Sequence, residues 1–172
     1  PTAYSFNQTS GCSIVTYTGT GTSGEGVPHG LGAKPKWYMV KRTDTTGSWQ
    51  VFTQPQINTS NATKYLRLNA TDAEATNNNR WNGWQPDATN FYLGNSTEVN
   101  ASGGTYVAYV FAEKPGYSRV GKYEGTGSAD GPFNYTGFKP AFVLIKEVNG
   151  ADIWAMYDNK RLGYNTANYV LE

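Results

Sequence analysis

Cysteine, histidine and charge are all scarce in this 172-residue chain. The single cysteine, Cys12, excludes an internal disulfide. The single histidine, His29, leaves no cluster of ligands for zinc and no evident Ser-His-Asp triad. Charged residues make up 16% of the chain and the net charge is +1, so a concentrated basic surface for nucleic acid is not expected. These absences favour a non-enzymatic protein with no catalytic residues, no metal and no cofactor.

Long hydrophobic runs are absent as well. No segment approaches 18 consecutive apolar residues, so we expect no membrane insertion. The N-terminus has neither the basic start nor the apolar core of a signal peptide. Because it also lacks an initiator methionine, we expect the chain to be processed or part of something longer.

Aromatic and small polar residues are abundant in place of charged residues. Aromatic residues account for 15% of the chain, with thirteen tyrosines, and Asn, Thr, Ser and Gly are abundant. This composition is typical of β-rich proteins with polar turns. Short β-branched or aromatic segments bounded by turn residues predict strands at 13–18, 36–42, 48–53, 64–68, 90–93 and 105–113. Only residues 71–78 favour a helical turn.

An internal repeat is the most informative feature of the sequence. Tyr17 and the glycines after it recur at Tyr123, an offset of 106, and the apolar run that starts at Trp37 recurs at Phe142, an offset of 105. Trp49 likewise recurs as Trp154. The pattern predicts a first β-sandwich repeat at 12–116 and a partial second repeat at 117–172 that stops at the counterpart of Arg67. The expected fold class is therefore all-β, an antiparallel β-sandwich of jelly-roll or concanavalin-like type, with one full unit and one partial unit.

One apparent nucleotide-binding motif lacks the helix that such a site requires. Residues 19–24 match G-x-G-x-x-G after a predicted strand, but a dinucleotide site needs a helix to begin there. The residues that follow, 25–30, are too rich in glycine and proline for a helix, and the second copy breaks the pattern. We therefore expect a flexible turn between strands.

The five tryptophans fall into two groups. Trp37, Trp49 and Trp154 occupy matched positions of the repeat, which predicts core side chains. Trp81 and Trp84 lie in a polar, Asn-rich stretch. Aromatic faces beside amide groups suit stacking on sugar rings, so a glycan site or a contact between protomers would involve four residues: Arg80, Trp81, Asn82 and Trp84. The alternative is that these side chains cap the edge of the sandwich.

Several sequence words are distinctive: GLGAKP at 30–35, LNATDA at 68–73, VNASGGTYVAY at 99–109, FAE at 111–113 and GSADGPF at 127–133. In these words and their order the chain resembles an uncharacterised repeat domain of virion proteins from marine tailed bacteriophages, including cyanophages, often within tail-fibre-like chains. The resemblance covers residues 13–164. It implies a location in the virion, on the outer surface of the particle, and transfers no catalytic or ligand residue.

The leading hypothesis is a virion structural or adhesion module, part of a tail fibre or similar appendage, that provides rigid spacing, self-association and contact with the host surface. Its expected partners are other copies of itself, with a trimer as the first guess, and other virion proteins. The alternatives are a carbohydrate-binding module that uses Trp81 and Trp84 to bind a host-surface glycan, and a capsid decoration or fibril protein. A depolymerase-type enzyme is the remaining rival.

Overall fold

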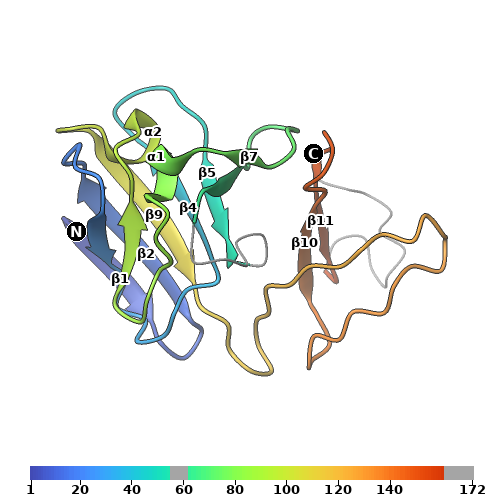
Figure 1. Ribbon diagram of the computed structural model, residues 1–172. Helices are drawn as coiled ribbons and strands as arrows, with labels where there is room; N and C mark the ends of the chain where they lie inside the picture. The colour runs from blue at the N-terminus through green and yellow to red at the C-terminus, as the bar shows by residue number, and fades with distance from the viewer. Residues whose placement is uncertain (55–61, 161–172) are drawn as a thin grey trace.

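The computed structural model describes residues 1–54 and 62–160, and in this part of the chain the fold is an antiparallel β-sandwich with two short helices (Figure 1). The all-β fold class predicted from the sequence is confirmed. The end of the predicted second repeat, after residue 160, lies outside the described residues.

A seven-stranded sheet forms the larger layer, in the order β1-β2-β9-β4-β5-β6-β7. Its strands are β1 (Ala3–Asn7), β2 (Cys12–Thr18), β4 (Trp37–Arg42), β5 (Gln50–Thr53), β6 (Lys64–Arg67), β7 (Ala75–Thr76) and β9 (Thr105–Phe111). The strand β9 lies between β2 and β4, and it is antiparallel to both. A strand from late in the sequence therefore joins the two early parts of the sheet.

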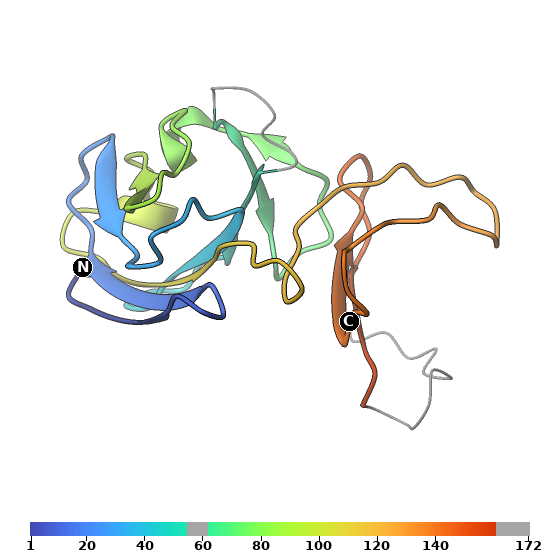
Figure 2. The ribbon, with the colours of Figure 1, turned by 90° about the horizontal axis from the view of Figure 1, so that it is seen from below.

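The smaller layer covers the concave side of this sheet (Figure 2). It consists of β3 (Glu25–Pro28) paired with β8 (Asn90–Leu93), together with the helices α1 (Asn78–Trp81) and α2 (Thr97–Asn100). Apolar side chains from both layers form one core. Strands β2, β4 and β9 contribute alternate residues, such as Tyr38 and Val40, and the second layer contributes Phe91 and Leu93. We call residues 3–111 the first unit.

The other face of strand β4 differs from the sequence expectation. Consecutive apolar residues predict a strand that is covered equally on both faces, but Trp37 and Met39 are only half-buried. The indole of Trp37 lies 5.0 Å from the ring of Phe111 on this outer face, and Trp49 lies 5.9 Å from Tyr109. The prediction that Trp37 and Trp49 belong to the central core is therefore wrong, because side chains alternate between the two faces of a strand.

The expectation of a helical turn at 71–78 is also corrected. Residues 71–74 form no helix, and the helix α1 begins only at Asn78 because the side chain of Asn77 accepts a hydrogen bond from the amide of Asn79. The strand β1 precedes the predicted start of the first repeat at residue 12 and pairs with β2 throughout its length. Between them, Gly11 has φ +69° and lies so close to Ala112 that a Cβ would come within 2.5 Å of its carbonyl oxygen.

After the first unit, the chain forms an extended arm, residues 119–141, and then the C-terminal hairpin, β10 (Phe142–Lys146) and β11 (Trp154–Asp158) (Figures 1 and 2). The hairpin lies beside β6 and β7. The indole of Trp154 donates a hydrogen bond to the carbonyl of Arg67, and the amide of Asp152 donates one to the carbonyl of Thr71. Trp154 is therefore half-buried against the first unit and does not lie within a core of its own.

Candidate functional site

The chain reverses direction between the two tryptophans of the Asn-rich stretch. Trp81 is the last residue of α1, and the next two residues, Asn82 and Gly83, both have left-handed backbone conformations, with φ of 56° and 70°. Asparagine and glycine are the residues that adopt this conformation most readily. The reversal sends Trp81 into the molecule and leaves Trp84 on the surface.

Trp81 belongs to the core. It is 0% exposed, its ring lies edge-on to Tyr38 at 5.1 Å, and its indole nitrogen donates to the carbonyl of Lys64 at 3.0 Å. The sequence-based assignment of Trp81 to a surface binding platform is therefore wrong. Trp81 is flanked by polar residues in the sequence. The sequence pattern therefore gives no indication that this side chain is buried.

Arg80 is also occupied within the protein. Its guanidinium lies over the ring of Tyr65, 4.8 Å from the centroid, and donates to the hydroxyl of Ser96. The side chain of Arg80 therefore links α1 to the start of α2 and is not part of the surface around Trp84. Of the four residues predicted from the sequence, the structure leaves Asn82 and Trp84 together at the surface.

Trp84 packs against an aromatic residue that was not among those predicted from the sequence. It is 51% exposed, and its ring lies 5.1 Å from Tyr92 on the outer face of β8, with an angle of 73° between the ring planes. Two glycines underlie the pair. A Cβ added at Gly24 would lie 3.6 Å from the Trp84 ring, and one at Gly26 would lie 3.3 Å from the Tyr92 ring.

A carboxylate adjoins this aromatic pair. Asp87 accepts a hydrogen bond from the hydroxyl of Tyr92 at 2.6 Å and two more from the amides of Thr89 and Asn90. These bonds, that of Tyr92 above all, hold the pKa of Asp87 below its ordinary value. Asp87 is therefore ionised at neutral pH, which makes its carboxylate a hydrogen-bond acceptor and a poor proton donor.

Asn82 lies near Trp84 beside Gly24, since a Cβ added at that glycine would contact both side chains. Its side-chain oxygen accepts a hydrogen bond from the hydroxyl of Ser23 at 2.7 Å. We call Ser23, Asn82, Trp84, Asp87 and Tyr92 the Trp84 surface. An exposed indole edged by a phenol, an amide and a carboxylate is suited to bind a sugar ring by stacking and hydrogen bonds. The signal for Tyr92 was present in the sequence, since Phe91 and Leu93 point inward and the residue between them must point outward.

The C-terminal hairpin presents a second unusual surface. Its register repeats that of β4 and β5 at an offset of 105, with Val143 opposite Tyr157 as Tyr38 lies opposite Phe52. The burial differs. Phe52 is 0% exposed within the first unit, whereas Tyr157 is 38% exposed and Val143 is exposed as well.

The arm shows the same contrast. Tyr123, the counterpart of the buried Tyr17, is exposed. At the same offset of 106, Phe133 corresponds to Val27, and their exposed fractions are 91% and 3%. Positions that form the core of the first unit are therefore occupied by apolar residues in the second part of the chain, but they are not covered. We call Tyr123, Val143 and Tyr157 the open face.

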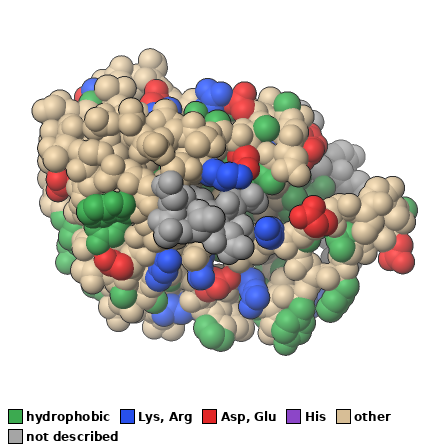
Figure 3. Space-filling model, viewed as in Figure 1, with side chains coloured by type: hydrophobic (Ala, Val, Ile, Leu, Met, Phe, Trp, Pro, Cys, Tyr) green, Lys and Arg blue, Asp and Glu red, His purple; other side chains and the backbone are tan. Residues whose placement is uncertain are grey.

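Among residues 1–54 and 62–160, no group of three or more His, Cys, Asp or Glu side chains is placed to hold a metal ion. On the face in Figure 3, Lys and Arg side chains are interspersed with Asp and Glu, and no continuous basic patch appears there. No helix in the described ranges is long and apolar enough to span a bilayer.

The sequence profile of one family matches residues 1–172, and it is described as a domain of unknown function, DUF7483. The chain belongs to this family. The DUF7483 match spans both the first unit and the segment with the open face. No curated protein and no solved structure shows significant similarity to the chain.

Proposed function

We propose that this DUF7483 chain is a non-enzymatic structural and adhesion module of a bacteriophage virion, located in a tail fibre or similar appendage. The observation that carries the assembly role is the open face, because its apolar residues are exposed at positions whose counterparts are buried in the first unit, and exposed apolar surface marks interaction sites in soluble proteins. The virion context is supported by the sequence words shared with the phage repeat domain.

The construction of the first unit suits a rigid spacer. Its seven-stranded sheet and second layer enclose one apolar core. Side-chain hydrogen bonds hold loops between its strands in place. Asn100 is an example, since its buried amide bonds the carbonyls of Thr22 and Gly94 and accepts from the amide of Thr20. The loop at 19–24 is thus held in place, where the sequence predicted a flexible turn. Rigid units joined to an assembly surface are what an appendage requires.

The location can be tested with a phage that encodes the chain. Purified particles would be analysed by mass spectrometry and labelled with antibodies raised against residues 1–172. We expect the chain to be present in the particle and the label to lie on a tail appendage. Label on the head would replace the appendage with a capsid decoration or fibril protein. Absence from purified particles, despite expression in infected cells, would refute the virion role.

A second candidate function, glycan binding, is favoured by the Trp84 surface. The aromatic pair provides a stacking face, and Asp87 and Asn82 provide hydrogen-bonding groups near it. A glycan array would be probed with the wild-type chain and the Trp84→Ala variant. The Tyr117→Ala variant is a matched control, because Tyr117 is an exposed aromatic residue outside this surface.

We expect binding to be lost in Trp84→Ala and retained in Tyr117→Ala. Trp84→Ala should change the free energy of unfolding by no more than about 0.5 kcal/mol, since the indole is exposed. Binding that is equal in the two variants, or absent in the wild-type chain, would exclude this surface as the glycan site.

A further inference from the structure

The turn that carries Asp87 in the Trp84 surface is held in place from inside the protein. His29 is 0% exposed, and its backbone amide donates to the carbonyl of Thr89 at 3.0 Å. Its ring Nδ1 accepts from the amide of Leu31, so in the neutral imidazole Nε2 carries the hydrogen and donates to the carbonyl of Asp87 at 3.2 Å. The carboxylate of Asp87 is therefore positioned at the surface before any ligand arrives.

This carboxylate has acceptor capacity to spare. Its Oδ1 accepts from the amides of Thr89 and Asn90, whereas Oδ2 accepts one hydrogen bond from the described residues, that of the Tyr92 hydroxyl. Each carboxylate oxygen can accept about two hydrogen bonds, so Oδ2 can accept another from a ligand. Tyr92 has already donated its only hydroxyl hydrogen. Asp87 and Tyr92 therefore suit a ligand that donates hydrogen bonds.

The charge of the surface is negative. Neither lysine nor arginine occurs in residues 18–33 or 81–113, the two segments that supply the Trp84 surface. The adjacent Arg80 stacks on Tyr65 and donates to Ser96, and the buried His29 has its pKa lowered by burial. Asp87 is then the one charged member of the Trp84 surface. A positively charged ligand is attracted to such a surface and an anionic ligand is repelled.

The aromatic component favours the same kind of ligand. The face of an indole is the best of the aromatic side chains at attracting an ammonium group, through the negative charge of its π system. Trp84 is 51% exposed, and the Tyr92 phenol that packs against it donates directly to Asp87. An ammonium group bound by Asp87 would therefore lie beside this aromatic pair.

We propose that the Trp84 surface binds a sugar that bears a protonated amino group. The sugar ring stacks on Trp84, and its ammonium group donates a hydrogen bond to Oδ2 of Asp87. An N-acetyl group in place of the amine removes the charge, and a sugar carboxylate is repelled. The inference deepens the glycan-binding candidate function and rests on it for the existence of a sugar site.

The probes are three pentasaccharides that share the backbone of cellulose and differ only in the group on carbon 2. Cellopentaose has a hydroxyl there, chitopentaose an N-acetyl group, and fully deacetylated chitopentaose an amino group. Each would be titrated into the isotope-labelled full chain at about pH 6, where the amine is protonated and Asp87 is ionised. Two-dimensional NMR would follow the indole N–H signal of Trp84, which reports binding at this surface.

We expect the deacetylated pentasaccharide to have a Kd about five- to tenfold lower than that of cellopentaose, from one solvent-exposed ion pair and a cation–π contact. Chitopentaose should show no such gain. General attraction of the positively charged probe is not expected, because the net charge of the chain is itself +1. A concentration of about 1 M salt should reduce the preference for the amine, since it screens exposed charges.

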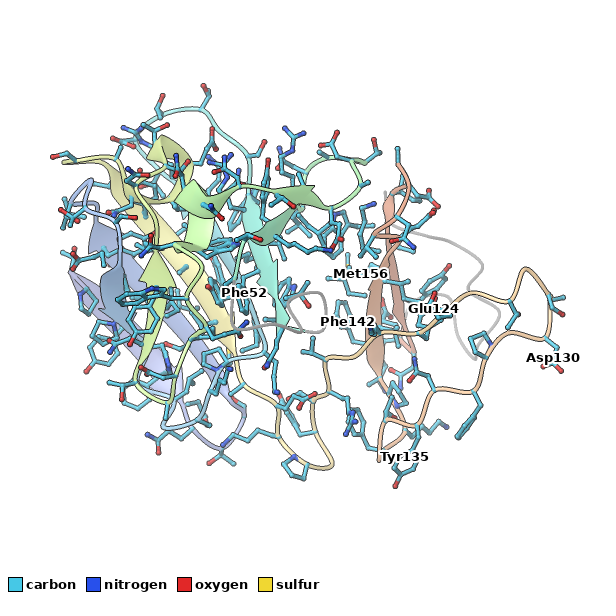
Figure 4. All side chains as sticks on the ribbon, viewed as in Figure 1. Phe52, Glu124, Asp130, Tyr135, Phe142 and Met156 are labelled. Carbon is cyan, nitrogen blue, oxygen red and sulfur yellow. The ribbon has the colours of Figure 1, made fainter. Side chains whose placement is uncertain are left out.

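Two matched variants test the role of the carboxylate. Asp87→Asn retains an oxygen for the amides of Thr89 and Asn90 but removes the charge, so the Kd values for the deacetylated probe and cellopentaose should come within about twofold of each other. Asp130→Asn removes an exposed charge at the tip of the arm (Figure 4) and should leave the preference unchanged. An unchanged signal from the buried indole of Trp81 would show that each variant is folded.

Equal affinity of the wild-type chain for the three probes would overturn the amino-sugar inference and leave the sugar site intact. A preference that survives Asp87→Asn, or that is lost equally in Asp130→Asn, would also overturn it. If no probe shifts the Trp84 signal, the inference is wrong, whereas the glycan-binding function fails only if the glycan array shows no binding that depends on Trp84.

Discussion

Phe52 in the first unit and Tyr157 in the C-terminal hairpin occupy the same position of two hairpins with one register, yet only Phe52 is buried. In Figure 4, Phe52 lies within the first unit, whereas Asp130 lies at the tip of the arm, outside that unit. The difference teaches that a hairpin is specified locally, whereas burial of its core face requires a second layer. The first unit has that layer in β3, β8 and the two helices.

Paired substitutions at these two positions should give the largest contrast. We expect Phe52→Ala to lower the free energy of unfolding by about 3–5 kcal/mol, because it leaves a cavity between the layers. Tyr157→Ala should lower it by no more than about 0.5 kcal/mol, because the ring is partly in water. Urea denaturation followed by fluorescence measures both. Equal losses would mean that the open face is covered in solution.

A second contrast is between the loop that follows β2 and the loop that follows its counterpart, residues 119–124. The loop at 19–24 is fixed by Asn100, whereas every residue of its counterpart, 125–130, is exposed. Asn100→Ala should lower the free energy of unfolding by about 1–3 kcal/mol, because it leaves buried backbone groups without partners. It should also speed amide exchange at Thr20.

Asn134→Ala is the matched control, since Asn134 is exposed, and it should have no measurable effect on either quantity. If Asn100→Ala is equally silent, the hydrogen bonds of Asn100 do not hold the loop at 19–24.

A smaller effect should appear in the pH dependence of stability. His29 is buried, its Nδ1 accepts a hydrogen bond from the amide of Leu31, and burial lowers its pKa from the ordinary value of about 6.5. The unfolded chain therefore binds a proton more readily than the folded one. Stability should be complete above about pH 6.5 and should fall as the pH drops below that value.

The residues that correspond to His29 in the second part of the chain, Asn134 and Tyr135, are exposed, and neither is a histidine. We therefore expect His29→Gln to flatten the profile of unfolding free energy between pH 7 and pH 5. Asp87, whose pKa is lowered, contributes in a separate and more acidic window, because its stabilisation is lost only as the pH falls below about 3.9. A wild-type profile that is flat from pH 7 to pH 5 would contradict the role given to His29.

The sequence predicted the long, patterned strands well and the short or irregular ones poorly. The strand Asn90–Leu93 was predicted with its observed bounds, and five others within two residues of theirs. The strand Glu25–Pro28 was missed because Gly26 and Pro28 oppose a strand assignment, and it forms only because β8 pairs with it. The strand Ala3–Asn7 was missed although Tyr4 and Phe6 alternate with small or polar residues and stack at 5.4 Å, because the segment is short and all its side chains are exposed.

The candidate site was predicted in part. The exposed Trp84 and its neighbour Asn82 were identified from composition, but Tyr92 and Asp87 come from a different element and meet Trp84 only in the folded chain. Trp81 was assigned to the same surface because it shares a polar context. The left-handed turn at Asn82 and Gly83 separates the two tryptophans, and that turn depends on backbone conformation that residue type alone suggests only weakly.

The amino-acid sequence by itself determined the β-rich class, most of the strands and the register shared by two hairpins 105 residues apart. These properties follow from local alternation and turn chemistry, which any short segment carries with it. Only the tertiary structure decided which apolar positions are buried and which remain open. Burial depends on strands that arrive from distant parts of the chain, and β9 supplies one to β4 while the described residues supply none to β10.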